Sequence, residues 1–143
     1  MSDALTTATI TENGASVFAV AINVSGHQLS GDEPIASGGG DTGPAPYDLL
    51  TAALGECTAM TVRWYAKQKN WPLEKVEVVI AYRKEALTEG ARPSDIFEKS
   101  ITLYGKDLSN EQRQKLIDVA AKCPVQRTLE GAPVIRTLTA PAE

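Results

Sequence analysis

Residues 47–69, YDLLTAALGECTAMTVRWYAKQK, decide the fold of this chain because they predict one long helix. Small or apolar residues recur at steps of three and four, the spacing of one helix face: Leu50, Leu54, Cys57, Thr61 and Trp64. The first half, from Leu49 to Met60, is small and apolar almost all round. We therefore expect this helix to be buried on most of its surface.

On the N-terminal side of the helix, residues 8–24 predict a β-hairpin. Asn13-Gly14 is a hairpin turn signal, and apolar residues alternate after it: Phe18, Val20, Ile22 and Val24. Residues 25–46 then predict a loop, because glycines and prolines interrupt any regular pattern between Gly38 and Pro46.

On the C-terminal side, residues 76–83 and 97–103 alternate as two strands, joined by a polar loop over 85–95. Ser109-x-x-Gln112 fits a capping box, which predicts the start of a second helix. Pro124 ends that helix and can begin another, with Cys123 as its N-cap. Residues 133–139 predict a last strand.

The predicted order of elements is ββ, long α, ββ, α, β, an α+β fold with mostly antiparallel strands. The 143 residues suit a single domain over 1–143. One small sheet cannot cover both sides of a helix that is apolar all round. We therefore expect an obligate homodimer with this helix at the interface.

Composition and charge narrow the class of protein. Hydrophobic residues make up 43% of the chain, yet no apolar run approaches the roughly 18 residues of a membrane span. The polar start lacks the features of a signal peptide, so we expect a cytoplasmic protein. A net charge of −4 argues against nucleic acid as a partner. All 14 Lys and Arg lie at Arg63 or later, so residues 1–62 carry only acidic charges.

Two cysteines, Cys57 and Cys123, are the residues of greatest chemical interest. With His27 they offer at most three N/S ligands, fewer than a structural zinc site needs, so no metal is expected. One interpretation is that each is a small buried hydrophobe. The other is that they are reactive, since Cys123 stands at a predicted helix N-terminus, where the dipole favours a thiolate.

A reactive pair of cysteines suits peroxide reduction. A thiolate attacks the O–O bond and becomes a sulfenic acid, which a second thiol converts to a disulfide. An external dithiol must then reduce that disulfide, so no bound cofactor is needed. Spacing alone leaves open whether Cys57 and Cys123 can meet.

Two segments carry a family resemblance. GPAPYDLLTAALGEC over 43–57 resembles the segment of the OsmC/Ohr family that leads into its reactive cysteine, and AKCPVQRTL over 121–129 resembles its second-cysteine motif. The resemblance implies an OsmC-like fold, an intertwined homodimer with long central helices between antiparallel sheets. It implies reduction of organic hydroperoxides, and of hydrogen peroxide more weakly. Cys57 would be peroxidatic and Cys123 resolving, with a dithiol such as a lipoyl protein as reductant.

The chain departs from the family pattern around the thiolate. Family members use an N-terminal arginine, but no Lys or Arg precedes Arg63 here, and the position of their supporting glutamate is Tyr47, next to Asp48. Replacement support could come from His27, Asp48 or Arg127. In the peroxidase interpretation, part of an apolar substrate pocket would be formed by Leu54, Met60 and Trp64.

The missing arginine also favours an alternative function. The same fold could serve as a non-enzymatic redox sensor or small-ligand-binding stress protein. A third interpretation, a structural interaction domain, requires both cysteines to be inert.

The homodimer can be tested by sedimentation equilibrium. We expect twice the chain mass of 15.2 kDa, because a monomer would leave an apolar helix face in water. A stable monomer at micromolar concentration would contradict the prediction.

Overall fold

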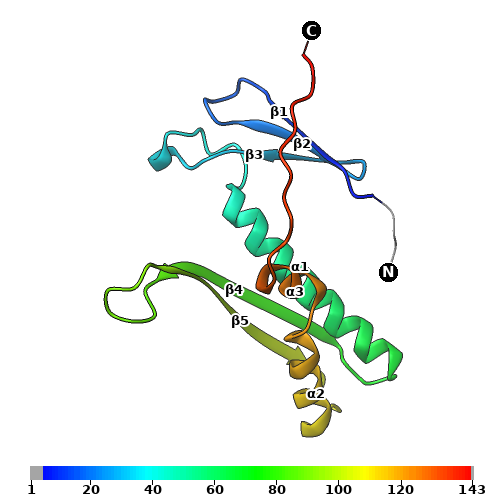
Figure 1. The fold of residues 1–143 in the computed structure, drawn as a ribbon. Helices are drawn as coiled ribbons and strands as arrows, with labels where there is room; N and C mark the ends of the chain where they lie inside the picture. The colour runs from blue at the N-terminus through cyan, green and yellow to red at the C-terminus, as the bar shows by residue number, and fades with distance from the viewer. Residues whose placement is uncertain (1–4, 143) are drawn as a thin grey trace. The chain divides into compact units, whose positions relative to one another are not determined.

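The order of helices and strands confirms the predicted α+β class with antiparallel sheets (Figure 1). The structure, a computed structural model, describes residues 5–142. The chain divides into two compact units, Met1–Thr51 and Ala52–Glu143, and each is described by itself. The single domain over 1–143 stays a prediction. Within residues 5–142, no helix has the length and apolarity required to cross a bilayer.

The first unit contains an antiparallel sheet in the order β1-β2-β3. β1 (Ala8–Glu12) and β2 (Val20–Val24) form the predicted hairpin, with Ile10 opposite Ile22. Its connection is longer than a two-residue turn, since the Asn13 N–H donates to the Ala19 carbonyl at 3.2 Å.

The predicted loop over 25–46 is wrong at its start. β3 (His27–Gly31) pairs with β2 across a two-residue turn, Ser25-Gly26, whose φ angles are 51° and 81°. Two positive φ angles match the twist of a tight hairpin. The sequence hides this strand because its side chains are mostly polar and exposed, so apolar alternation is lost. A short 3-10 helix, η1 (Ile35–Ser37), follows.

Asp32 organises the chain between β3 and the long helix. Its buried carboxylate accepts hydrogen bonds from the Ser16 and Thr42 hydroxyls and from the N–H groups of Glu33, Gly40 and Thr42. Burial alone would raise the pKa of Asp32, but these bonds hold it well below its ordinary value. The carboxylate therefore stays ionised and fixes the glycine-rich loop.

α1 (Pro46–Gln68) confirms the predicted long helix to within one residue at each end. Pro46 stands at its first position, and the Asp48 carboxylate accepts from the Ala45 N–H at 2.9 Å. Past the other end, Asn70 adopts a φ of 56°, and the Trp71 N–H donates to the Ala66 carbonyl. A left-handed residue of this kind closes a helix C-terminus.

The second unit pairs β4 (Lys75–Glu85) with β5 (Ser94–Tyr104), as predicted, although both strands extend further into the polar loop. α2 (Asn110–Ala120) begins with the predicted capping box, in which Ser109 and Gln112 bond reciprocally. α3 (Pro124–Glu130) begins with Cys123 as its N-cap, also as predicted.

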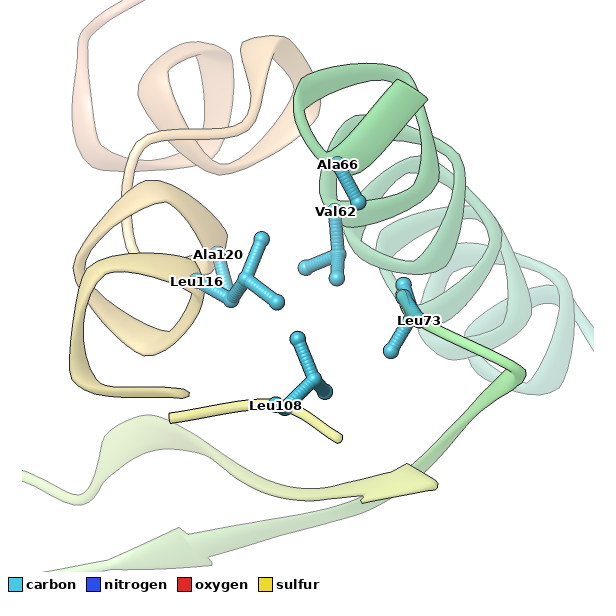
Figure 2. Packing of buried hydrophobic residues seen from close by; sticks show 6 residues of the cluster. All are labelled: Val62, Ala66, Leu73, Leu108, Leu116 and Ala120. Atoms are coloured by element: carbon cyan, nitrogen blue, oxygen red, sulfur yellow. The ribbon is translucent and has the colours of Figure 1, made fainter. Parts of the chain in front are cut away.

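The core of this unit lies where α1, α2 and the ends of the β-strands meet (Figure 2). Its buried apolar residues come from α1, from α2 and from the loops beside the strands: Val62, Ala66, Leu73, Leu108, Leu116 and Ala120. Figure 2 shows the Leu116 side chain pointing across to α1.

The predicted last strand over 133–139 is wrong. The chain from Gly131 to Ala142 has no regular structure, and the side chains of Val134, Ile135 and Leu138 are exposed. The apolar residues do not alternate, and Pro133 cannot donate to a ladder.

The expected burial of α1 on most of its surface is not found within the chain. Its fully buried side chains form a single stripe at steps of four: Leu54, Thr58, Val62 and Ala66. Met60 and Trp64 are each 61% exposed. One sheet and α2 cover only one side of the helix, so the homodimer that would cover the rest stays a prediction.

Leu116→Ala should destabilise the protein by about 2–5 kcal/mol, because it leaves a cavity in a fully buried site. The neighbouring change Ile117→Ala should cost less than about 1 kcal/mol, since Ile117 is 37% exposed. Urea unfolding followed by circular dichroism, at one protein concentration, measures both. Equal losses would contradict the assignment of Leu116 to the core.

Candidate thiol site

Cys57 on α1 and Cys123 at the start of α3 meet at the same turn of the chain. The Val125 N–H donates to the Cys57 sulfur and the Gln126 N–H donates to the Cys123 sulfur, both at 3.4 Å. Cys57 is also among the groups that lower the pKa of the Cys123 thiol. Both cysteines are free thiols in this structure. The chain thus brings together two residues that are 66 positions apart in sequence.

The two thiols differ in access. Cys123 is fully buried, with 0% of its surface exposed, whereas Cys57 is only partly buried. The difference follows from position, because Cys123 is enclosed between helices while Cys57 lies beside the buried stripe of α1. A reagent from solution therefore meets Cys57 first.

Thr58 and Lys99 complete the surroundings of Cys123. The buried Thr58 hydroxyl lies 3.5 Å from the Cys123 sulfur and donates to the Leu54 carbonyl at 2.7 Å. The Lys99 ammonium group donates to Thr58 Oγ1 at 3.1 Å and to the Ala120 carbonyl at 2.7 Å. A cation from β5 thus lies one hydroxyl group away from a buried thiol.

These contacts shift the acidity of the thiol and of the lysine. Burial raises the pKa of Cys123, but the bonds with Thr58, the Gln126 N–H and Cys57, together with the charge of Lys99, bring it below its ordinary value. Burial lowers the pKa of Lys99, while negative charge on Cys123, Cys57 and Glu130 acts in the opposite direction.

Lys99 is the site residue that sequence reasoning missed. The strand pattern drew attention to Phe97, Ile101 and Leu103, and Lys99 lies on this same face of β5. It stands opposite Ile80 of β4. The sequence shows this lysine among the apolar residues of one strand face, and that pattern could have identified it, because a charge there needs partners inside the protein.

The predicted supporting residues lie at the start of β3, in the first turn of α1 and on α3. His27 is exposed at the start of β3, and Tyr47 and Asp48 lie in the first turn of α1, where Asp48 binds the Ala45 N–H. These three belong to the Met1–Thr51 unit. Arg127 is exposed on α3, one turn after Cys123. Their support of the thiols stays a prediction.

The predicted pocket residues divide into two kinds. Leu54 belongs to the buried stripe of α1, whereas Met60 and Trp64 are exposed and follow Cys57 by three and seven positions. This spacing places both exposed side chains on the face of α1 that carries Cys57. A separate apolar hollow of about 430 Å³ lies in the first unit, with Phe18 and Leu49 in its wall.

Gln126, whose backbone N–H binds the Cys123 sulfur, has a side-chain oxygen without a partner. Its Oε1 is the buried side-chain oxygen for which the described residues supply no donor. Its Nε2 donates to Glu130 at 3.3 Å. Over residues 5–142, no group of three or more His, Cys, Asp or Glu is gathered to hold a metal ion.

Comparisons with known proteins identify the family to which the chain is similar. The model of the family described as OsmC-like protein matches residues 38–137. An OsmC-like protein from Mycoplasma pneumoniae is similar in structure, with a TM-score of 0.73, 19% identity, and coverage of 91% of this chain and 90% of the other. No curated protein is a significant match.

Two further solved structures have a similar fold. An organic hydroperoxide resistance protein from Elizabethkingia anophelis gives a TM-score of 0.68 at 19% identity, covering 91% of each chain. The organic hydroperoxide resistance protein OsmC from Legionella pneumophila gives 0.62 at 19% identity, covering 92% of this chain and 93% of the other. At these identities the likeness establishes the fold.

A small alkylating reagent such as iodoacetamide should label Cys57 before Cys123. We expect a rate difference of about tenfold or more, because a fully buried thiol reacts only when the chain opens locally. Mass spectrometry of peptides from the reduced protein measures both rates. Faster labelling of Cys123 would contradict the order of access.

Proposed function

The chain belongs to the OsmC-like protein family, and we propose that it is a thiol-dependent peroxidase that reduces organic hydroperoxides, and hydrogen peroxide more weakly. The observation that carries the proposal is the meeting of Cys57 and Cys123 at the first turn of α3. Each sulfur accepts its own N–H from this turn, so both thiols lie at one helix N-terminus.

The reaction assigns a separate role to each thiol. The Cys57 thiolate attacks the outer oxygen of the hydroperoxide, the O–O bond breaks, and the released alkoxide takes up a proton to leave as an alcohol. Cys57 is then a sulfenic acid. The sulfur of Cys123 attacks it, an S–S bond forms, and the hydroxyl group leaves with the thiol proton as water. An external dithiol, such as a lipoyl protein, returns the disulfide to two thiols.

The exposure of Cys57 and the apolar side chains beside it support this assignment of roles. The partly exposed Cys57 is the thiol that a substrate can reach, and the buried Cys123 lies behind it. Met60 and Trp64 offer apolar surface on the same helix face for the organic part of a hydroperoxide. A second copy of the chain, packed against α1, would close this surface into a pocket.

Neighbouring proteins lend further support. The similar structures from Elizabethkingia anophelis and Legionella pneumophila are named as organic hydroperoxide resistance proteins. Free thiols of this kind persist in a reducing compartment, so the cytoplasm suits the proposed cycle.

A redox sensor or small-ligand-binding protein is the second candidate. The complete burial of Cys123 favours it, since a resolving thiol that reacts slowly would make oxidation a lasting signal rather than a step of turnover.

Stopped-flow oxidation of the reduced protein by cumene hydroperoxide and by hydrogen peroxide tests the peroxidase. Two thiols per chain should be lost, faster with the organic peroxide. Cys57→Ser should slow oxidation by roughly a hundredfold or more, because the attacking thiolate is gone. Cys123→Ser should lose one thiol and accumulate a sulfenic acid that dimedone traps.

Thr102→Ser, an exposed change on β5, provides the control and should oxidise at the wild-type rate. Slow oxidation without preference for the organic peroxide would favour the sensor. Normal turnover by the Cys123 variant, with a dithiol present, would remove the resolving role.

A further inference from the structure

We propose that Lys99 is the positioning residue for the thiol pair: its ammonium group, held by Thr58 and Ala120, stabilises the negative charge that the pair carries after losing a proton. The inference rests on the proposed function for its place in a reaction, but its test requires no peroxide. It gives the site the cation that residues 1–62 do not contain.

The surroundings of Lys99 leave few other roles for its charge. It lies on the apolar face of β5, opposite Ile80, and is partly buried. Among the described residues, the ion pairs join Arg83 and Lys84 to carboxylates, and none of these pairs includes Lys99. A charge in such a place is costly without an opposite charge nearby. The nearest groups able to supply one are the two thiols and Glu130.

The contacts of Thr58 show how Lys99 acts on Cys123. A hydroxyl group has one proton, and in this structure Thr58 donates it to the Leu54 carbonyl at 2.7 Å. That carbonyl is also the acceptor for the helical N–H four residues later. The Thr58 hydroxyl can therefore rotate and donate its proton to a thiolate at Cys123, 3.5 Å away. The Leu54 carbonyl keeps its helical N–H partner when this happens.

Lys99 favours this rotation of the Thr58 hydroxyl. Its ammonium group donates to Thr58 Oγ1 at 3.1 Å and so occupies a lone pair of that oxygen. The bond to the Ala120 carbonyl at 2.7 Å fixes the ammonium group at the end of α2. A lysine polarising a hydroxyl group strengthens the hydrogen bond which that hydroxyl donates.

The two thiols share the charge that Lys99 stabilises. Both thiols act on the charge of Lys99, and the loss of one proton from the pair leaves a single negative charge for it to stabilise. The groups around the Lys99 ammonium come from three helices. Cys57 and Thr58 belong to α1, the Ala120 carbonyl to α2, and Glu130 to α3, whose N-cap is Cys123. The charge of Lys99 acts on the Cys123 sulfur and is itself favoured by negative charge on either thiol.

Ultraviolet titration of thiolate absorbance in the reduced protein tests the proposal. Lys99→Met should move the first thiol midpoint upward by about one pH unit or more, leaving about tenfold less thiolate at neutral pH. Lys99→Arg should restore most of the wild-type midpoint, because it keeps the charge. Thr58→Val should also raise the midpoint, and Thr58→Ser should not.

Lys84→Met is the matched control, since Lys84 lies exposed on the paired strand, and its midpoint should equal that of the wild type. Circular dichroism identifies variants that fail to fold. An unchanged midpoint in folded Lys99→Met, or no difference between Thr58→Val and Thr58→Ser, would overturn the proposal. Loss of peroxide reactivity in the wild type would remove the proposed function alone, because the titration measures ionisation directly.

Discussion

One stripe of small and medium side chains on α1, at intervals of four residues, carries both the core and the thiol site. Val62 and Ala66 belong to the apolar cluster closed by Leu116, whereas Thr58, one turn earlier, brings a hydroxyl group to Cys123. α2 also takes part in both regions, since the side chain of Ala120 lies in the core and its carbonyl accepts from Lys99. A change in how α2 packs on Val62 would therefore also move the carbonyl of Ala120, which holds Lys99.

Thr58 in the buried stripe of α1 and Lys99 on the apolar face of β5 explain the surroundings of the thiols better than the cysteines alone. Sulfur is a weak hydrogen-bond acceptor, and an enclosed thiol is ordinarily inert. Cys123 differs because Thr58, the Gln126 N–H and Lys99 all act on it at once. The fold places each of these groups on a separate element, so the environment of the thiol exists only when α1, β5 and α3 are assembled.

Local patterns predicted the elements of this fold well where side-chain chemistry dictates backbone geometry. The capping box at Ser109, the cysteine before Pro124 and the long periodicity of α1 all depend on neighbours within one turn. β3 was not predicted because its side chains are mostly polar and exposed. The strand predicted over 133–139 does not form, because strand formation depends on a distant partner edge that local sequence does not reveal. Lys99 was missed for the same reason: its partners, Thr58 and Ala120, lie 41 and 21 residues away.

The Cys123 sulfur is both the N-cap of α3 and the proposed resolving thiol, so its oxidation would affect the stability of α3. In the reduced protein this atom caps the helix by accepting the Gln126 N–H. A sulfur engaged in a disulfide is a poorer acceptor, so oxidation would weaken a cap worth up to about 1 kcal/mol. By the relation between free energy and potential for a two-electron couple, that loss would make the proposed Cys57–Cys123 disulfide about 20 mV more oxidising. In the proposed cycle, a helix of only seven residues would thus contribute to the reduction potential of the thiol pair and would favour its reduced form.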